Sequence, residues 1–305
     1  MRTFGAGILA ALFAAGAICL AVPAGAKGLR KVVAVSRFEN KSSYASGGEA
    51  ALTNGLVDQL TDALIQSGQF VVLTRQTLSD VVGEQDLAAS GRFRASKSAQ
   101  TGKLVSAQIL VEGAVTEFES RSSGGLSGIS LGGFRLGTQR ESAHVGLMIR
   151  LVDTTTGEVI ASKRAEGSAS AGGLKVETQI KDIEIGSESF KKTPLGKATQ
   201  IAIDEAVEFI ASSLREVPFQ ARVLKVSGDE VTIGAGEKHG VKAGDEFRVV
   251  AENEELVDPD TGERLGHEEQ EIGSVKVYEV REKYCKAKTV GEIPGIKRGD
   301  LVRAE

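Results

Sequence analysis

The sequence of 305 residues has no tryptophan, two cysteines and three histidines. Cys19 lies in an N-terminal segment that we expect to be removed, so Cys285 has no partner for an intramolecular disulfide. Stability must then come from hydrophobic cores, and a chain of this length can hold two of them. The shortage of cysteine therefore excludes a small disulfide-stabilised protein.

The lack of chemically active residues argues against an enzyme. His144, His239 and His267 lie on separate predicted elements, with no ligand spacing to one another or to Cys285. The segment 258–263 imitates the start of a calcium loop, but Gly262 and Glu263 stand where that loop needs a ligand and a glycine. The sequence therefore predicts no catalytic residues, no cofactor and no metal.

Charge excludes another class of partner. The 37 basic residues face 41 acidic ones, so the chain has no basic excess for binding nucleic acid. Aromatic residues make up only 5% of the chain, although membrane barrels carry aromatic girdles at both interfaces. The sequence therefore predicts no nucleic-acid partner and disfavours a barrel formed by one chain alone.

The first 26 residues have the pattern of a secretory signal peptide. Arg2 supplies a positive start, residues 8–22 form an apolar core, and 24–26 is a small-residue cleavage site. Cys19 follows the bulky Ile18, which a lipoprotein signal does not tolerate, so we expect export without lipidation. No other run approaches the ~20 apolar residues of a membrane helix, so insertion into a bilayer would have to use β-strands.

Residues 27–217 alternate between strand and helix patterns. Strands are predicted at 31–38, 70–73, 109–118, 144–151 and 159–166, the last two joined by a turn at 153–158. Leucines every four residues from Leu52 to Leu64 predict a helix that ends at Gly68, and Thr193-Pro194 begins another helix. The segment 40–48 is a polar loop around one aromatic residue, Tyr44. This alternation predicts an α/β layer.

Two insertions break this pattern. The first, at about 121–142, is rich in Gly and Ser, yet apolar residues recur in it with a period of two. The second, at about 168–192, alternates apolar and charged residues. Each reads either as a β-hairpin that can lie against lipid or as a surface ribbon. The candidate lipid-facing residues are Leu126, Ile129, Leu131, Phe134, Leu136, Leu174, Val176, Thr178 and Ile180.

From residue 218 onward, short strand patterns separated by glycine turns predict a small all-β barrel. Its motifs KHGVKAGDEFRVV and IKRGDLVR resemble the C-terminal barrel of some flagellar assembly proteins. The expected fold is therefore α+β, with an α/β domain at 27–217 that carries two hairpins and a β-barrel domain at 218–305.

Several motifs occur in the same order as in the CsgG/HfaB family of curli-secretion channels. They are AVSRFEN, LTNGLVDQLTDALIQSGQFVVLTR, LVSAQILVEGAVTEFES, the Gly-rich insertion, VGLMIRLVDTTTGEVIASKR and the helix at Pro194. The resemblance covers roughly residues 31–217. It implies a periplasmic α/β domain that assembles into a homo-oligomeric ring, in which each protomer lends two hairpins to one shared outer-membrane barrel. It also makes Tyr44 the candidate pore-loop residue, although the Asn and Phe of the family's loop are missing here.

Two functions follow from this reading. The first is an oligomeric outer-membrane secretion channel that exports secreted or surface proteins. The second is a soluble periplasmic scaffold on the same core, which acts through protein contacts and keeps both insertions as surface ribbons. Fold likeness alone does not choose between them.

Overall fold

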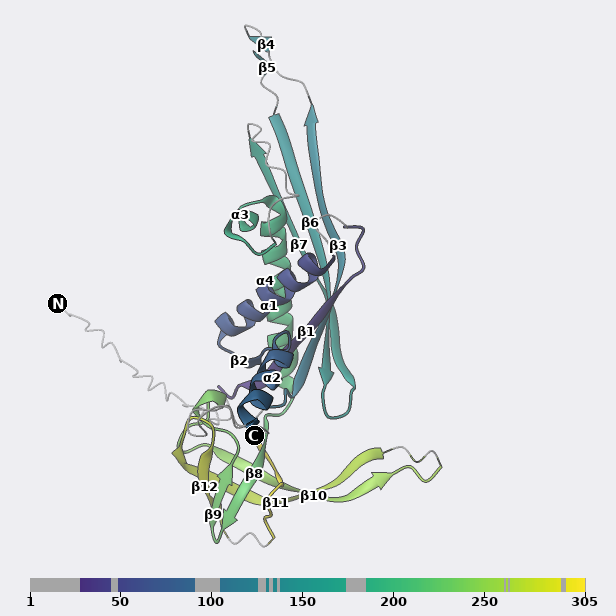
Figure 1. Cartoon of the computed structure of the whole chain (residues 1–305). Coiled ribbons are helices and arrows are strands. Elements are labelled where there is room, and N and C mark those ends of the chain that lie inside the picture. Colours follow the sequence, from purple (N-terminus) through teal and green to yellow (C-terminus); the bar gives the residue numbers. More distant parts are fainter. Residues whose placement is uncertain are drawn as a thin grey trace, which may run out of the picture.

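A computed structural model describes residues 28–44, 49–90, 105–125, 130–131, 134–135, 138–173, 185–260, 262, 264–291 and 295–304. Within these residues it contains a five-stranded sheet covered by helices, followed by a closed barrel of six strands (Figure 1). The predicted α+β fold is confirmed.

The sheet has the strand order β2-β1-β3-β6-β7. β1 pairs in parallel with β2 and β3, whereas β3, β6 and β7 pair antiparallel. The bounds are Lys31–Asn40 for β1, Phe70–Leu73 for β2, Ile109–Gly125 for β3, Thr138–Asp153 for β6 and Val159–Gly173 for β7. The parallel half needs crossover connections, which is why helical patterns alternate with strands there.

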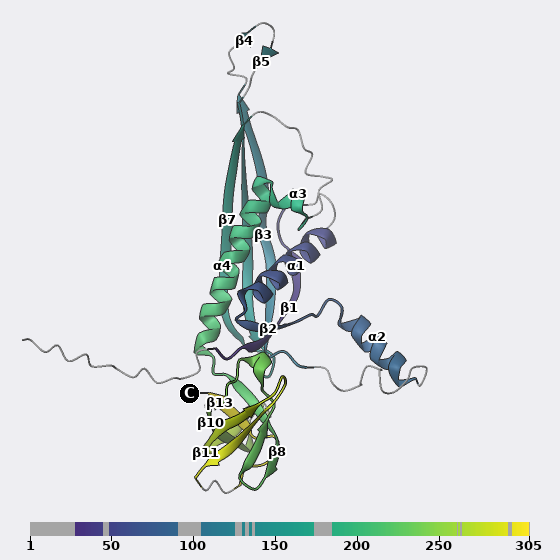
Figure 2. The ribbon, with the colours of Figure 1, turned by 90° about the vertical axis from the view of Figure 1, so that its left-hand side faces the viewer.

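Two long helices cover one face of this sheet (Figure 2). Helix α1, Glu49–Ser67, buries its leucines against β1 and ends before Gly68, whose φ of +64° suits a residue without a side chain. Helix α4, Pro194–Glu216, begins where the Thr193 hydroxyl accepts a hydrogen bond of 3.0 Å from the Gly196 backbone N–H. Both predicted helices are therefore present.

Helix α2, Leu78–Ala89, stands away from the sheet (Figure 2). Its apolar residues Val81, Val82 and Leu87 are each exposed by more than a third. The helix therefore adds little to the hydrophobic core.

The strands of the first hairpin are longer than the predicted strands 109–118 and 144–151. β3 and β6 pair without interruption from Ile109↔Asp153 to Gly125↔Thr138, apart from a bulge between Val115 and Glu117. Two short strands, β4 at Ser130–Leu131 and β5 at Phe134–Arg135, pair with each other near the tip. The hairpin thus rises well above the helices as an arm (Figure 1).

The second insertion differs from the expected hairpin at its end. Residues 188–191 form a short helix, α3 at Glu188–Lys191, instead of a strand. The Ser187 hydroxyl caps it by accepting from the Phe190 N–H at 3.2 Å, and the Phe190 ring is buried against Phe118. Burial of this aromatic ring favours a local helix at the end of the insertion. Residues 188–191 are therefore helical instead of part of a strand, and residues 174–184 lie outside the described part.

The second unit is a barrel with the strand order β10-β11-β12-β9-β8-β13. The bounds are Gln220–Ser227 for β8, Glu230–Ile233 for β9, Glu246–Val257 for β10, Arg264–Val280 for β11, Cys285–Val290 for β12 and Leu301–Ala304 for β13. A single 3₁₀ turn, Glu237–His239, lies between β9 and β10. β10 and β11 run on past the barrel as a two-stranded extension (Figure 1).

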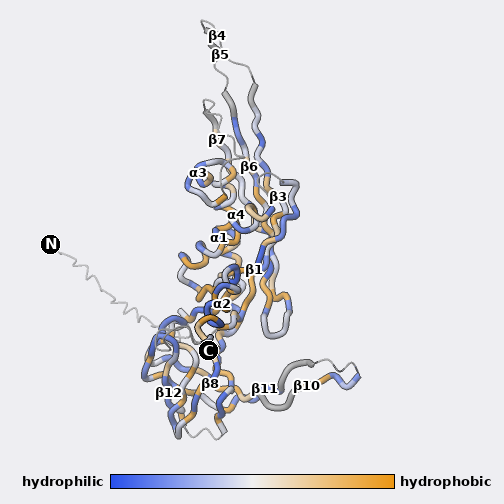
Figure 3. Tube along the Cα trace, viewed as in Figure 1, coloured by the Kyte–Doolittle hydropathy of each residue, from blue (hydrophilic) through white to orange (hydrophobic). Residues whose placement is uncertain are grey.

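The two units have separate hydrophobic clusters. One lies between the sheet and α1, α3 and α4, and the other fills the barrel around Phe247, Val249 and Val275. Figure 3 shows apolar colour on the strands and helices of the sheet unit. The division into domains at residues 217 and 218 stays a prediction, which a fragment experiment can test.

Candidate functional site

The face of the sheet opposite the helices carries an open polar groove on β3, β6 and β7. Its hollow has a volume of about 730 Å³ and is lined by Glu117, Glu119, Arg121, Ser142, Ala143, His144, Ser168, Ala169 and Ser170. Strand alternation places the polar residues of this set on the outer face, because side chains two residues apart share a face. Their neighbours in sequence, such as Phe118 and Val145, point into the core.

A β-bulge on β3 sets which residues face the groove. Val115 pairs with Leu147 and Glu117 pairs with Gly146, so Thr116 is an extra residue on this strand. The extra residue reverses the phase of the strand. Without it Glu117 would point into the core and Phe118 would point into water.

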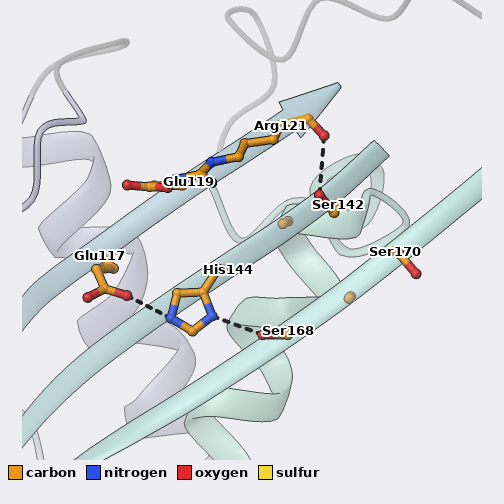
Figure 4. A pocket seen from close by; sticks show the side chains of 9 residues that line it. Glu117, Glu119, Arg121, Ser142, His144, Ser168 and Ser170 are labelled. Carbon is orange, nitrogen blue, oxygen red and sulfur yellow. Dashed lines mark hydrogen bonds and ion pairs between the residues drawn. The ribbon is translucent and has the colours of Figure 1, made fainter. Parts of the chain in front are cut away.

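His144 lies at the centre of the groove, between residues of the two neighbouring strands (Figure 4). Its Nε2 lies 2.7 Å from Glu117 Oε2, and its Nδ1 lies 2.9 Å from Ser168 Oγ. Arg164 on β7 forms an ion pair with Glu117 and a second one, of 2.7 Å, with Glu166. These contacts link all three strands at the base of the arm.

Most charged side chains of the groove form ion pairs with one another. A hydrogen bond from Arg164, followed by the attraction of its charge and that of His144, holds the pKa of Glu117 below its ordinary value of 4.5. Higher up, Arg121 pairs with Glu119 at 2.9 Å. The outer face therefore presents alternating charges and hydroxyl groups.

The order Glu117, His144, Ser168 is that of a carboxylate, imidazole and hydroxyl relay. Hydrolytic relays also need donors for an oxyanion and a site that excludes water. Here the side chains of His144 and Glu117 are 34% and 37% exposed on an open sheet surface. This arrangement suits contact with water and with polar chains better than it suits catalysis.

The described residues contain no group of three or more His, Cys, Asp and Glu side chains that could hold a metal ion. Cys285 is buried in the barrel, and burial, helped by the charge of Asp245, raises the pKa of its thiol to about 12. This thiol is therefore protonated at neutral pH and acts as a core residue.

Tyr44, the predicted pore-loop residue, packs against the core cluster beside Phe118 of β3. Its ring meets Phe118 edge to face at a centroid distance of 4.8 Å, and partial burial raises the pKa of its hydroxyl. The Asn40 amide donates to the Tyr44 carbonyl at 3.0 Å. Residues 45–48 lie outside the described part, and the pore role of Tyr44 stays a prediction.

The predicted lipid-facing residues lie at or beyond the end of the described arm. Leu131 and Phe134 are paired between β4 and β5. Leu126, Ile129 and Leu136, and all four candidates in the second insertion, lie outside the described residues. Their lipid contact stays a prediction.

The strand register relates the two insertions to each other. Gly124 pairs with Gln139, and Gln139 pairs with Gly173. These three residues therefore lie side by side across the arm. The apolar segments that begin at Leu126 and Leu174 both start just beyond this level in the sequence.

The sequence pattern alone does not indicate that Glu117, His144 and Ser168 form a cluster. Alternation of polar residues on adjacent strands could have indicated a hydrophilic face. It could not have brought Glu117 to that face, because the bulge at Thr116 is set by pairing with β6.

Among the described residues, no helix is both long and apolar enough to cross a membrane.

Comparison with known proteins gives two family matches along the chain. The profile of the curli production assembly/transport component CsgG matches residues 21–243. The profile of the flagellar assembly protein T C-terminal domain matches residues 228–303. The two matches overlap at residues 228–243, which contain β9 and the 3₁₀ turn.

Individual relatives are more distant. The curli production assembly/transport components CsgG of Escherichia coli K12 and Salmonella typhimurium LT2 are each 27% identical over 122 residues, which is 39% of this chain and 44% of theirs. The matched region thus spans less than half the length of these relatives.

Solved structures give weaker likenesses. The hypothetical protein CT253 of Chlamydia trachomatis is 15% identical, with a TM-score of 0.39 over 61% of this chain and 98% of that one. A PelC dodecamer from Paraburkholderia phytofirmans is 14% identical, with a TM-score of 0.27 over 60% of this chain and 87% of that one. Neither score supports a statement about function. The family match covers most of the chain, and this protein belongs to the family of the curli production assembly/transport component CsgG.

Proposed function

We propose that this chain is the exported subunit of a ring-shaped secretion channel at the outer membrane, which passes secreted or surface proteins. The observation that carries the proposal is the common level of Gly124, Gln139 and Gly173. Since the apolar segments of both insertions start beyond it, a single band of apolar residues would surround the end of the arm. Such a band is what a shared membrane barrel requires.

The open edges of the arm support assembly. β1 ends its pairing with β3 at Asn40↔Val115, so β3 has no described partner on that side above Val115. β7 is the last strand of the sheet on the other side. Unpaired strand edges invite pairing with another chain, and closure of a ring removes them all.

Strand direction further constrains the ring. β3 and β7 run toward the tip and β6 runs away from it, because neighbouring strands here are antiparallel. A ring of antiparallel strands needs an even number of strands from each subunit. We therefore propose that residues 174–184 supply a fourth, descending strand next to β7.

The polar groove fits the inner wall of such a channel. Its paired charges and hydroxyl groups can be wetted without exposing apolar surface, and exported chains must pass through water. We propose that Glu117, His144 and Ser168 face the lumen below the membrane. The family to which the chain belongs is one of transport components, which agrees with the open form of this groove.

One observation favours the scaffold as a second candidate. The described part of the arm is polar on both faces, with Arg121 and Glu141 on opposite sides. The apolar stretch 126–136 allows about five residues per strand, or ~17 Å, against the ~30 Å of a bilayer core. A ribbon of this length would touch a membrane or a partner without crossing it.

Reconstitution in planar bilayers separates these candidates. Purified oligomer of the full chain should give stable, stepwise currents if the strands below the apolar stretch complete the span. A matched variant, in which residues 126–136 become a Gly-Ser stretch of equal length, should lose the currents while its circular-dichroism spectrum is unchanged. Absence of currents from the unaltered oligomer would support the scaffold.

A further inference from the structure

A second hollow lies where the sheet unit meets the barrel. It has a volume of about 940 Å³, within the usual range for binding pockets. Its apolar lining comes from both units and consists of Leu29, Phe70, Ala211, Leu214, Val217, Pro218, Phe219 and Ala304. The groove on β3, β6 and β7 is a separate site with no residue in common.

The hollow is also basic. Five of its lining residues are cationic, namely Arg30, Lys31, Arg215, Arg248 and Arg303, against one carboxylate at Glu216. The Lys31 ammonium donates to the Leu214 carbonyl, and burial lowers the pKa of this amine. An anion placed here would be favoured by the surrounding charge.

Two of these arginines already form ion pairs with carboxylates of the same chain. Arg303 contacts Glu269 with both terminal nitrogens, and Arg248 lies 3.3 Å from Glu271. Both glutamates belong to the lower part of the extension formed by β10 and β11. Guanidinium and carboxylate groups match in shape as well as in charge. Two arginines that line the hollow therefore already pair with carboxylates of this extension where it leaves the barrel.

The extension itself is strongly acidic. Residues 252–271 contain nine Asp and Glu against a single arginine, Arg264, which gives a net charge of −8 with the histidine neutral. The whole chain has a net charge of −4, so the other residues together carry an excess of four positive charges. The extension and the rest of the molecule are thus opposite in sign.

The end of the extension is apolar where it can be described. Leu256 and Val257 are each 48% exposed, next to the turn at Asp258 and Asp260. About seven residues of each strand lie beyond the barrel, which corresponds to ~23 Å. Two exposed aliphatic side chains flanked by carboxylates match a hollow that is lined by apolar and basic residues.

We propose that the tip of the β10–β11 extension of one subunit docks in the basic hollow of the next subunit. The extension points away from the body of its own subunit (Figure 1), so its tip meets a neighbour instead of its own hollow. Donor and acceptor lie at different places on one chain, and such head-to-tail contacts form a ring when the rotation between successive subunits closes. The proposal rests on the proposed ring and adds a second contact to it, outside the membrane arm.

Charge reversal with compensation tests the docking on the full mature chain in detergent. The acceptor variant combines Arg30→Glu with Arg215→Glu, and the donor variant combines Asp260→Arg with Glu268→Arg. All four side chains are exposed, so folding should be unaffected. Each double variant should raise the concentration needed for half assembly about tenfold, and the fourfold variant should restore the original value. The reversal of Lys225 and Lys283, which are exposed and do not line the hollow, is the control and should have no effect.

The possible results separate the docking from the ring. Rings that tolerate all reversals would overturn the docking alone, and so would a fourfold variant that assembles no better than the acceptor variant. An unaltered chain that stays monomeric would overturn both. Val257→Asp gives an independent check, because it removes apolar contact while adding a charge of the sign already present, and it should also weaken assembly.

Discussion

At the scale of single residues, two glycines show how differently the same residue type is used in this fold. A Cβ atom on Gly167 of β7 would lie 1.9 Å from the carbonyl oxygen of Ala198 on α4. The backbone of helix α4 therefore approaches the sheet directly at this point, between its alanines. A Cβ atom on Gly83, in the middle of α2, would have no neighbouring atom within 4 Å, so this glycine makes no such contact.

We expect Gly167→Ala to destabilise the protein by about 1–3 kcal/mol, because the helix must move outward to admit the methyl group. Gly83→Ala is the matched control and should stabilise α2 by about 0.5–1 kcal/mol, since alanine favours the helix. Urea unfolding measures both changes. Equal effects of the two substitutions would contradict the close approach of α4 to β7.

Glu117 should make stability depend on pH. Its folded-state pKa is below the ordinary 4.5, so the contribution of its ion pair with Arg164 is present above pH 4.5. That contribution is lost as the pH falls through the lower, folded-state pKa. The loss of stability between pH 7 and about pH 3 should therefore be smaller for Glu117→Gln than for the unaltered chain. Identical urea midpoints for the two proteins at every pH would show that this pair is not coupled to folding.

At the scale of elements, local patterns predicted most of the sheet unit. The leucine spacing of α1, the stop at Gly68 and the Thr193 cap of α4 are local features, and each is found in the structure. The strands and the barrel also follow from alternation and glycine turns. These elements are predictable because the residues that specify them are close in sequence.

Other elements depend on residues far apart in the chain. The bulge at Thr116 results from pairing with β6, and it alone turns Glu117 toward His144. Helix α3 forms around Phe190 because the ring finds Phe118, more than seventy residues earlier. The length of β10 and β11 beyond the barrel likewise depends on their mutual pairing. None of these contacts leaves a periodic trace in the sequence.

The alternation of the second insertion can be tested by substitution. If Leu174, Val176, Thr178 and Ile180 form a lipid-facing row, then Glu177 must face the lumen, because successive side chains of a strand alternate. Val176→Arg should then prevent membrane assembly, at ~2–4 kcal/mol per subunit for a site near the midplane. Glu177→Arg should leave assembly intact and change only the lumen charge. Membrane fractionation compares the two, and equal, mild effects would favour the surface ribbon.

At the scale of the whole molecule, the sheet unit and the barrel are expected to fold separately. Each has its own hydrophobic cluster, and the barrel closes on itself through the pairing of β10 with β13. A fragment of residues 219–305 should therefore give a β-type circular-dichroism spectrum and a cooperative thermal transition. An unfolded fragment would mean that the barrel requires the sheet unit, for example through the bond of 2.8 Å from the Gln108 amide to the Gln220 carbonyl.

The mass of the assembled protein distinguishes a membrane ring from a soluble monomer. The full chain is expressed with its signal peptide, and the mature protein is extracted from the envelope. Its mass is then measured by mass photometry with and without detergent. A membrane-inserted ring should give one closed assembly of many subunits that comes out of the membrane fraction only with detergent. A monomer that is released without detergent and remains monomeric at high concentration would contradict it.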